Sequence, residues 1–201
     1  MQNLKYSAGA VSKGFWFQEF KKYIDELGKG KTEADIKKEQ EENNLFLAPS
    51  PSYGQKMINE IARRARALPE DILEIFPGVN VSDQKLINLL GIMMTDRLFF
   101  EFMYEVYREA LLMGTKKFED RAVRIFFKNK SDQNHRVAAY TEETKDRLRA
   151  AYKTYLRESN LLIDKDEGAI YQRPLMDISL EDKLKEPSLY PYLAAITGVV
   201  L

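Results

Sequence analysis

Residues 98–113 read LFFEFMYEVYREALLM and form the most membrane-like run of this 201-residue chain. The run is shorter than a bilayer needs, and the charges inside it disfavour a membrane span. Those charges lie four, three and one positions apart, so they share one narrow stripe of an otherwise apolar helix: Glu101, Glu105, Arg108 and Glu109. The pattern therefore predicts the buried central helix of a soluble fold, over about 96–113.

The charge balance hides a strong local asymmetry around this helix. The whole chain has 31 Lys and Arg against 31 Asp and Glu, and it has no cysteine. Residues 52–68 carry a local charge of +3 and residues 116–157 carry +6, whereas 69–114 carry −5 and 158–201 carry −4. Two basic segments are compatible with phosphate binding that the neutral total conceals. The absence of cysteine excludes disulfides and cysteine-bound zinc.

Helical patterns also dominate the sequence before the central helix. Apolar spacing predicts a helix over 12–27. Capping residues predict three more helices: over 33–43 after Thr32, over 53–68 with a Ser52–Gln55 capping box, and over 83–94 after Ser82. A short helix is expected to follow Pro69, which suits a first turn.

The sequence after the central helix has a different order of elements. Helices are predicted over 118–130, over 134–139 and from Thr141 to about 158, followed by a small β-hairpin around the turn Asp164–Gly168. This is the order of a winged helix-turn-helix. We therefore expect a mainly α fold with a helix-turn-helix-like N-terminal part, the buried central helix and a winged-helix-like C-terminal part. The corresponding regions are 1–68, 69–115 and 116–201.

Catalytic patterns are missing from the sequence. His135 is the single histidine, and no motif supplies the partner that a general base needs. The glycines of 9–14 have phosphate-loop spacing, but Phe15 and Trp16 follow where lysine and serine or threonine are required. The Asp164–Gly168 turn lacks the later glutamate of a calcium loop. We predict a protein that is not an enzyme and has no cofactor or metal.

Two amphipathic helices carry the candidate binding residues. Each is expected to anchor an apolar stripe and to turn long basic side chains outward, as a recognition helix does. The candidates are Lys56, Arg63, Arg64 and Arg66 on 53–68, and Arg147, Arg149, Lys153 and Arg157 on 142–158. The alternative is that these are solvated faces, with the arginines of 53–68 paired to the acidic middle segment, 69–114. If nucleic acid binds, both faces should contribute to one basic surface, and the acidic hairpin tip should not.

The sequence resembles the BrxA family, a small component of the BREX phage-defence systems of bacteria. The resemblance covers nearly the whole chain and is carried by KYSAGAVSKGFWFQEF at 5–20, LFLAPSPSYGQKMINEI at 45–61, LINLLGIMMTDRLFFEFMYEVY at 86–107 and AAYKTYLRESNLL at 150–162. It implies a cytoplasmic, mostly helical protein with helix-turn-helix-like parts that binds DNA. It also implies other BREX proteins as partners, among them a methyltransferase, an ATPase and a phosphatase-like protein.

We therefore expect a non-enzymatic accessory protein that binds double-stranded DNA with low sequence specificity and does not enter a membrane. Two alternatives stay open. One is an RNA binder of the NusB type, to which the family has been likened. The other is a protein scaffold whose basic helices meet acidic partner surfaces.

Overall fold

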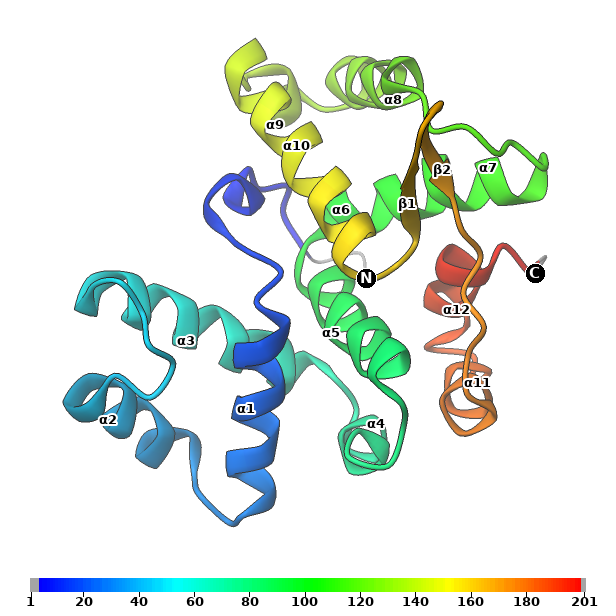
Figure 1. The fold of residues 1–201 in the computed structure, drawn as a ribbon. Coiled ribbons are helices and arrows are strands. Elements are labelled where there is room, and N and C mark those ends of the chain that lie inside the picture. The colour runs from blue at the N-terminus through cyan, green and yellow to red at the C-terminus, as the bar shows by residue number, and fades with distance from the viewer. Residues whose placement is uncertain (1–3, 200–201) are drawn as a thin grey trace.

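A computed structural model describes residues 4–199 and is mainly helical, with one small antiparallel hairpin (Figure 1). Figure 1 shows α1–α3 at one end of the molecule and α8–α10 at the other, with the central helix between them. The helices are α1 Phe17–Gly28, α2 Glu33–Asn43, α3 Pro51–Ala67, α4 Glu70–Ile75, α5 Val81–Thr95, α6 Arg97–Phe102, α7 Arg108–Leu112, α8 Asp120–Gln133, α9 His135–Ala138, α10 Glu142–Glu158, α11 Ile178–Leu184 and α12 Tyr190–Thr197.

The predicted central helix is confirmed; its first part, through Tyr107, is mostly buried, whereas residues 108–112 bury only Arg108. α6 continues through a π-helical turn, Met103–Tyr107, into α7. The Asp96 carboxylate caps its start by accepting the Phe99 N–H at 3.1 Å. Phe99 and Phe102 both pack against Tyr152 of α10, with ring centroids 5.0 and 5.1 Å apart. These contacts join the central helix to the C-terminal part in one hydrophobic core.

The N-terminal helices pack around α3. α3 crosses α5 so closely that a Cβ added to Gly91 would lie 3.0 Å from the Arg64 Cβ and 3.2 Å from the Arg64 carbonyl oxygen. The capping box predicted at α2 is confirmed, since Thr32 and Asp35 cap each other reciprocally. The capping box predicted from Ser52 is wrong: Ser50 accepts the Tyr53 N–H, and Pro51 takes the first helical position.

Two further helix starts differ from the prediction. The helix predicted over 12–27 begins only at Phe17, because Trp16 adopts a left-handed backbone conformation with φ 50°. The helix predicted after Ser82 is instead capped by Asn80, whose side chain accepts the Ser82 and Asp83 N–H groups. Residues 4–16, which we call the N-terminal strap, run as an extended segment with a short 3-10 turn, Gly9–Ser12.

The C-terminal part has the predicted order of helix, short helix, long helix and hairpin. Thr141 caps α10 as expected, by accepting the Thr144 N–H. The hairpin pairs β1, Leu162–Lys165, with β2, Gly168–Tyr171, in a register that opposes Leu162 to Tyr171. Gly168 has φ 117°, a conformation that favours glycine after the tight turn. α11 and α12 complete the fold, with α12 packed along the π-helical turn and α7.

Candidate nucleic-acid interface

The exposed cations of α3 are largely occupied by carboxylates. Arg63 donates to both Glu60 oxygens at 2.6 and 3.0 Å, and its third bond goes to the Thr95 carbonyl. Arg66 donates to Glu33 of α2 at 2.5 Å. Within residues 4–199, the exposed Lys56 makes no side-chain hydrogen bond or ion pair. On α3, Lys56 is thus the predicted residue that stays available to a ligand.

Arg64 lies in the core, so the expectation that it sits on an exposed flank is wrong. Its side chain is fully buried, and its guanidinium donates to the Phe15 carbonyl at 2.7 Å and the Gly14 carbonyl at 2.8 Å. Its Nε lies 3.6 Å from a Glu60 oxygen. Burial lowers the pKa of Arg64, with the Glu60 charge opposing that shift. Arg64 therefore ties the strap to α3 and cannot reach a ligand.

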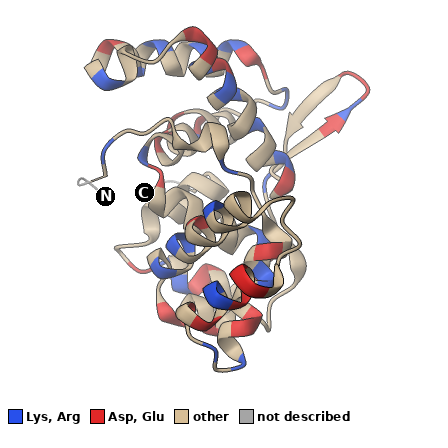
Figure 2. Ribbon diagram, turned by 90° about the vertical axis from the view of Figure 1, so that its left-hand side faces the viewer, with Lys and Arg blue, Asp and Glu red and all other residues tan. Residues whose placement is uncertain are grey.

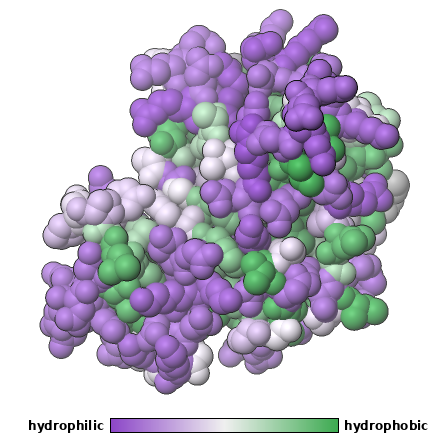
Figure 3. Space-filling view, viewed as in Figure 1, coloured by the Kyte–Doolittle hydropathy of each residue, from purple (hydrophilic) through white to green (hydrophobic). Residues whose placement is uncertain are grey.

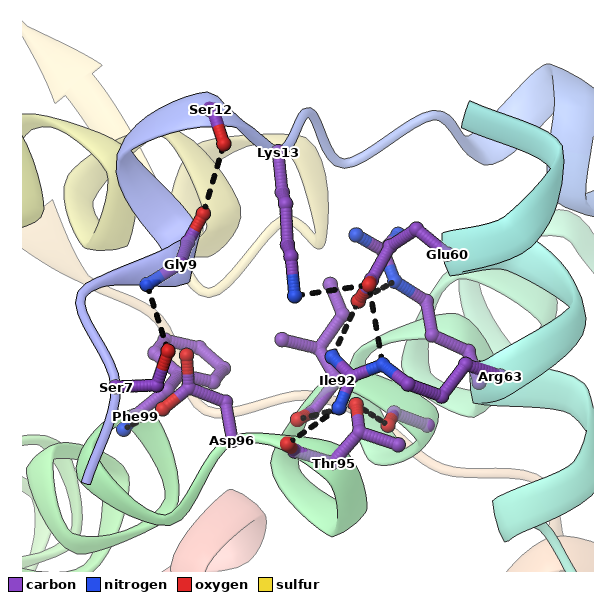
Figure 4. A network of polar contacts seen from close by, with 12 residues as sticks. Ser7, Gly9, Ser12, Lys13, Glu60, Arg63, Ile92, Thr95, Asp96 and Phe99 are labelled. Carbon is purple, nitrogen blue, oxygen red and sulfur yellow. Dashed lines mark hydrogen bonds and ion pairs between the residues drawn. The ribbon is translucent and has the colours of Figure 1, made fainter. Parts of the chain in front are cut away.

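A polar junction forms where the strap crosses between α3 and α10 (Figure 4). Lys13 of the strap contacts Glu60 at 2.8 Å, and the Tyr155 hydroxyl of α10 donates to the Lys13 carbonyl at 2.7 Å. Burial raises the pKa of Glu60, but hydrogen bonds from Arg63 and Lys13 outweigh it and hold that pKa below its usual value. The carboxylate therefore stays charged and offsets one of the three positive charges around it, those of Lys13, Arg63 and Arg64.

Three of the four predicted cations of α10 also have carboxylate partners. Arg157 forms a forked pair with Asp164 of the hairpin, at 2.8 and 2.9 Å. Arg149 pairs with Asp146 one turn earlier, and Lys153 lies 3.4 Å from Asp120 while resting over the Phe118 ring. Arg147 is exposed and has one long bond of 3.5 Å, to the Val11 carbonyl. Most of the predicted cations of α3 and α10 are therefore paired, but none of their carboxylate partners within residues 4–199 lies in the acidic segment 69–114 that the alternative assigned to the arginines of α3.

Reasoning from the sequence missed a basic stripe on α8. Arg121, Arg124 and Lys128 are exposed, and within residues 4–199 their side chains make no hydrogen bond or ion pair. They lie three and four positions apart, which places them on one face of the helix. The opposite face buries Val123 and Phe127. The sequence showed the spacing of these three residues but not that they lack partners. Asp120 lies four positions before Arg124 and could have paired with it, but it pairs with Lys153 of α10 instead.

The overall distribution of charge is mixed. Figure 2 shows Lys and Arg interspersed with Asp and Glu along most helices of that view, and Figure 3 shows a largely hydrophilic face broken by separate hydrophobic patches. In the described part of the chain no helix is long and apolar enough to cross a bilayer. Nor does any group of three or more His, Asp or Glu side chains among residues 4–199 form a place for a metal ion.

Comparison with known proteins identifies the family and supports the fold. The family model BrxA matches residues 4–188. A protein described as "BREX protein BrxA", from Bacillus cereus strain H3081.97, is 29% identical over 193 residues, which are 96% of each chain. The crystal structure of an uncharacterized protein from Magnetospirillum magneticum has a TM-score of 0.78 at 12% identity, and the match covers 98% of this chain and 100% of that one. That structure supports the fold alone. Because the family model spans nearly the whole described chain, the chain belongs to the BrxA family.

Proposed function

We propose that the protein is a non-enzymatic accessory component of a BREX phage-defence system and that it binds double-stranded DNA. Its partners would be the other BREX proteins: the methyltransferase, the ATPase and the phosphatase-like protein. The family membership supports the role in BREX. The observation that carries DNA binding is the α8 stripe, because its three cations are exposed and have no carboxylate to displace.

The spacing of the stripe suits a nucleic-acid backbone. Arg121 and Lys128 are seven residues apart, which corresponds to about 10 Å along a helix axis. Duplex DNA carries one phosphate per about 3.4 Å of axis along each strand, so phosphates are dense enough for each of the three cations to face one. Guanidinium groups suit phosphate oxygens because their donors form a rigid fork. Paired cations, such as Arg63 and Arg157, would have to break an existing ion pair before they could bind.

The C-terminal part would act as a winged-helix-like unit in an unusual orientation. The first turns of α10 carry Glu142, Glu143 and Asp146, and the hairpin tip carries Asp166 and Glu167. A standard winged helix presents the start of its long helix and the tip of its hairpin to DNA, but here phosphates would repel the acidic side chains at both. We therefore assign the main contact to α8, with Arg147 and Lys56 as additional contacts. Contacts to phosphates carry no sequence information, so low specificity follows.

The test is a matched pair of triple variants. In the first, Arg121, Arg124 and Lys128 are all replaced by Gln. In the control, Lys21, Lys38 and Lys165 are replaced by Gln, so the net charge changes equally. Fluorescence anisotropy with a random-sequence duplex is measured over a salt series. We expect the α8 variant to bind more weakly and to flatten the plot of log affinity against log salt by about 2.7, at about 0.9 for each contact. The control should follow the wild type.

Three outcomes would contradict the proposal. Equal binding by the two variants would move the interface away from α8. Stronger competition by RNA than by duplex DNA would favour the NusB-like alternative. No salt-dependent binding of the wild type to either nucleic acid would favour a protein scaffold.

A further inference from the structure

A basic hollow lies at the C-terminal end of α8, between the strap, the start of α6 and α9. Its volume is about 340 Å³. It is lined by Leu4, Lys5, Tyr6, Arg97, Asn134, His135 and Arg136. Among the described residues no carboxylate lines the hollow, whereas three lysine or arginine side chains do: Lys5, Arg97 and Arg136. Such a concentration of cations in a concave site raises the local concentration of anions.

The side chain of Arg97 is held in a fixed position at the hollow by Glu101 and Tyr6. Its Nε donates to Glu101 at 2.8 Å, and its guanidinium lies over the Tyr6 ring, 4.3 Å from the centroid. The Tyr6 hydroxyl donates to the same carboxylate at 2.8 Å. Apart from Glu101 and Tyr6, Arg97 has no side-chain partner within residues 4–199. A fixed side chain with unused donors loses little conformational entropy when it binds a ligand.

The carboxylates near the hollow do not cancel its charge. Lys130, which is buried, contacts Glu101 at 2.7 Å and Glu105 at 2.5 Å. Burial raises the pKa of Glu101, but bonds from Lys130, Arg97 and Tyr6 outweigh it and hold the pKa below its usual value. By formal charge, Lys5, Arg97, Lys130 and Arg136 carry four positive charges against the two negative charges of Glu101 and Glu105, which leaves a local charge of +2.

Arg136 and its neighbours complete the set of donors. Arg136 makes one long bond, of 3.4 Å, to the Tyr6 carbonyl, and most of its donors are unused within the described residues. The Asn134 oxygen caps α9 by accepting the Arg136 N–H at 3.0 Å, which leaves the Asn134 amide donors available. The exposed Lys5 ammonium comes from the strap. Two guanidinium forks with an ammonium group and an amide form a donor set that matches a tetrahedral oxyanion.

We infer that this hollow is a binding site for a phosphate group. The phosphate could belong to a nucleic-acid backbone or to a free phosphate or nucleotide, because the chemistry of recognition is the same. If it belongs to a duplex, the inference rests on the proposed function. α9 follows α8 directly after Asn134, so the hollow lies at the C-terminal end of α8.

The experiment compares Lys5→Gln with Arg136→Gln, as one double variant, against the control Lys38→Gln with Lys165→Gln. All four side chains are exposed, so both variants should fold, which circular dichroism checks. Binding of sodium phosphate and of adenosine monophosphate is followed by NMR, with sodium chloride at equal ionic strength as the reference. We expect saturable shifts at residues 5, 97 and 134–136 in the wild type and the control, and none in the hollow variant.

A duplex arm separates the two sources of phosphate. If the hollow holds one backbone phosphate, the hollow variant should flatten the salt dependence of duplex binding by about 0.9 while the control does not. If phosphate binding is lost but duplex binding is unchanged, the ligand is a free phosphate or nucleotide. If the wild type ignores duplex DNA but still shows the phosphate shifts, the proposed function fails and the site stands. The absence of any phosphate-specific shift, with equal duplex binding by both variants, would overturn the inference.

Discussion

Arg64 holds its charge in the core because three groups converge on it. The guanidinium binds two carbonyls of the strap, and Glu60 supplies the opposite charge at 3.6 Å. Replacing Arg64 with Met should cost about 3–5 kcal/mol, since the carbonyls and Glu60 lose a buried partner. The measurement is urea unfolding followed by circular dichroism.

The control for the Arg64 variant is Arg66→Met, two residues further along the same helix. Arg66 is exposed and pairs with Glu33 at the surface, so its loss should cost less than about 1 kcal/mol. Equal destabilisation by the two variants would mean that the strap contacts of Arg64 contribute little to stability.

Asp96 is the opposite case, because removal of its buried carboxyl group should raise the stability of the protein at neutral pH. Burial raises the pKa of Asp96, and the Phe99 N–H together with the charges of Lys13 and Arg63 only partly opposes that shift. The folded state therefore binds the proton more tightly than the unfolded state, where the pKa is near 3.8. The contribution of the Asp96 proton to the free energy of unfolding is therefore fully present below pH 3.8, and it is lost as the pH rises through the pKa of the folded state.

Asp96→Asn should keep the cap on Phe99 and remove this loss. We expect the variant to be more stable than the wild type at pH 7, and the difference to shrink as pH falls toward 4. Thermal unfolding across this pH range tests both statements. A variant that is less stable at every pH would show that attraction to Lys13 and Arg63 outweighs the cost of burial.

Among the elements, the crossing of α3 and α5 depends on a glycine. Gly91→Ala would place a methyl group 3.2 Å from the Arg64 carbonyl oxygen, where backbone cannot move away cheaply. Overpacking of this kind costs about 1–3 kcal/mol, which exceeds the gain of up to about 1 kcal/mol in helix propensity. Gly28→Ala is the matched control, because nothing lies within 4 Å of the added atom. It should be neutral or slightly stabilising, and thermal unfolding of both variants decides the matter.

The elements that the sequence predicted well are those with local causes. The capping box of Thr32 and Asp35, the cap at Thr141 and the hairpin turn all depend on residues a few positions apart. The start of α1 could not be predicted, because the carbonyls before it bond to partners such as Arg64 and Tyr155, 50 and 142 positions away. Periodicity cannot report such distant partners.

The candidate site was predicted less well for a related reason. Helical periodicity identified which faces of α3 and α10 carry cations, and most of those cations are at least partly exposed. It could not show that Glu33 would reach Arg66 or that Asp164 would reach Arg157. Nor could it show that Arg121, Arg124 and Lys128 would remain without partners. The number and spacing of charged residues can be read from the sequence, whereas binding depends on which of those residues are already in ion pairs.

For the molecule as a whole, we expect a single cooperative unfolding transition. The predicted regions 1–68, 69–115 and 116–201 share one hydrophobic core, and the strap bonds to residues of all three. Differential scanning calorimetry should give equal calorimetric and van't Hoff enthalpies. Two resolved transitions would show instead that the regions unfold as separate domains.

The strap also has a consequence for the order in which the protein is made. The ribosome makes the strap before it makes α6 and α10, yet the Lys13 carbonyl accepts from Tyr155 of α10, and the Tyr6 hydroxyl donates to Glu101 of α6. During translation the strap is therefore made early and completes its contacts late. Until α10 has left the exit tunnel, the strap lacks these contacts, and this is the stage at which proteases and chaperones would have the most access to it.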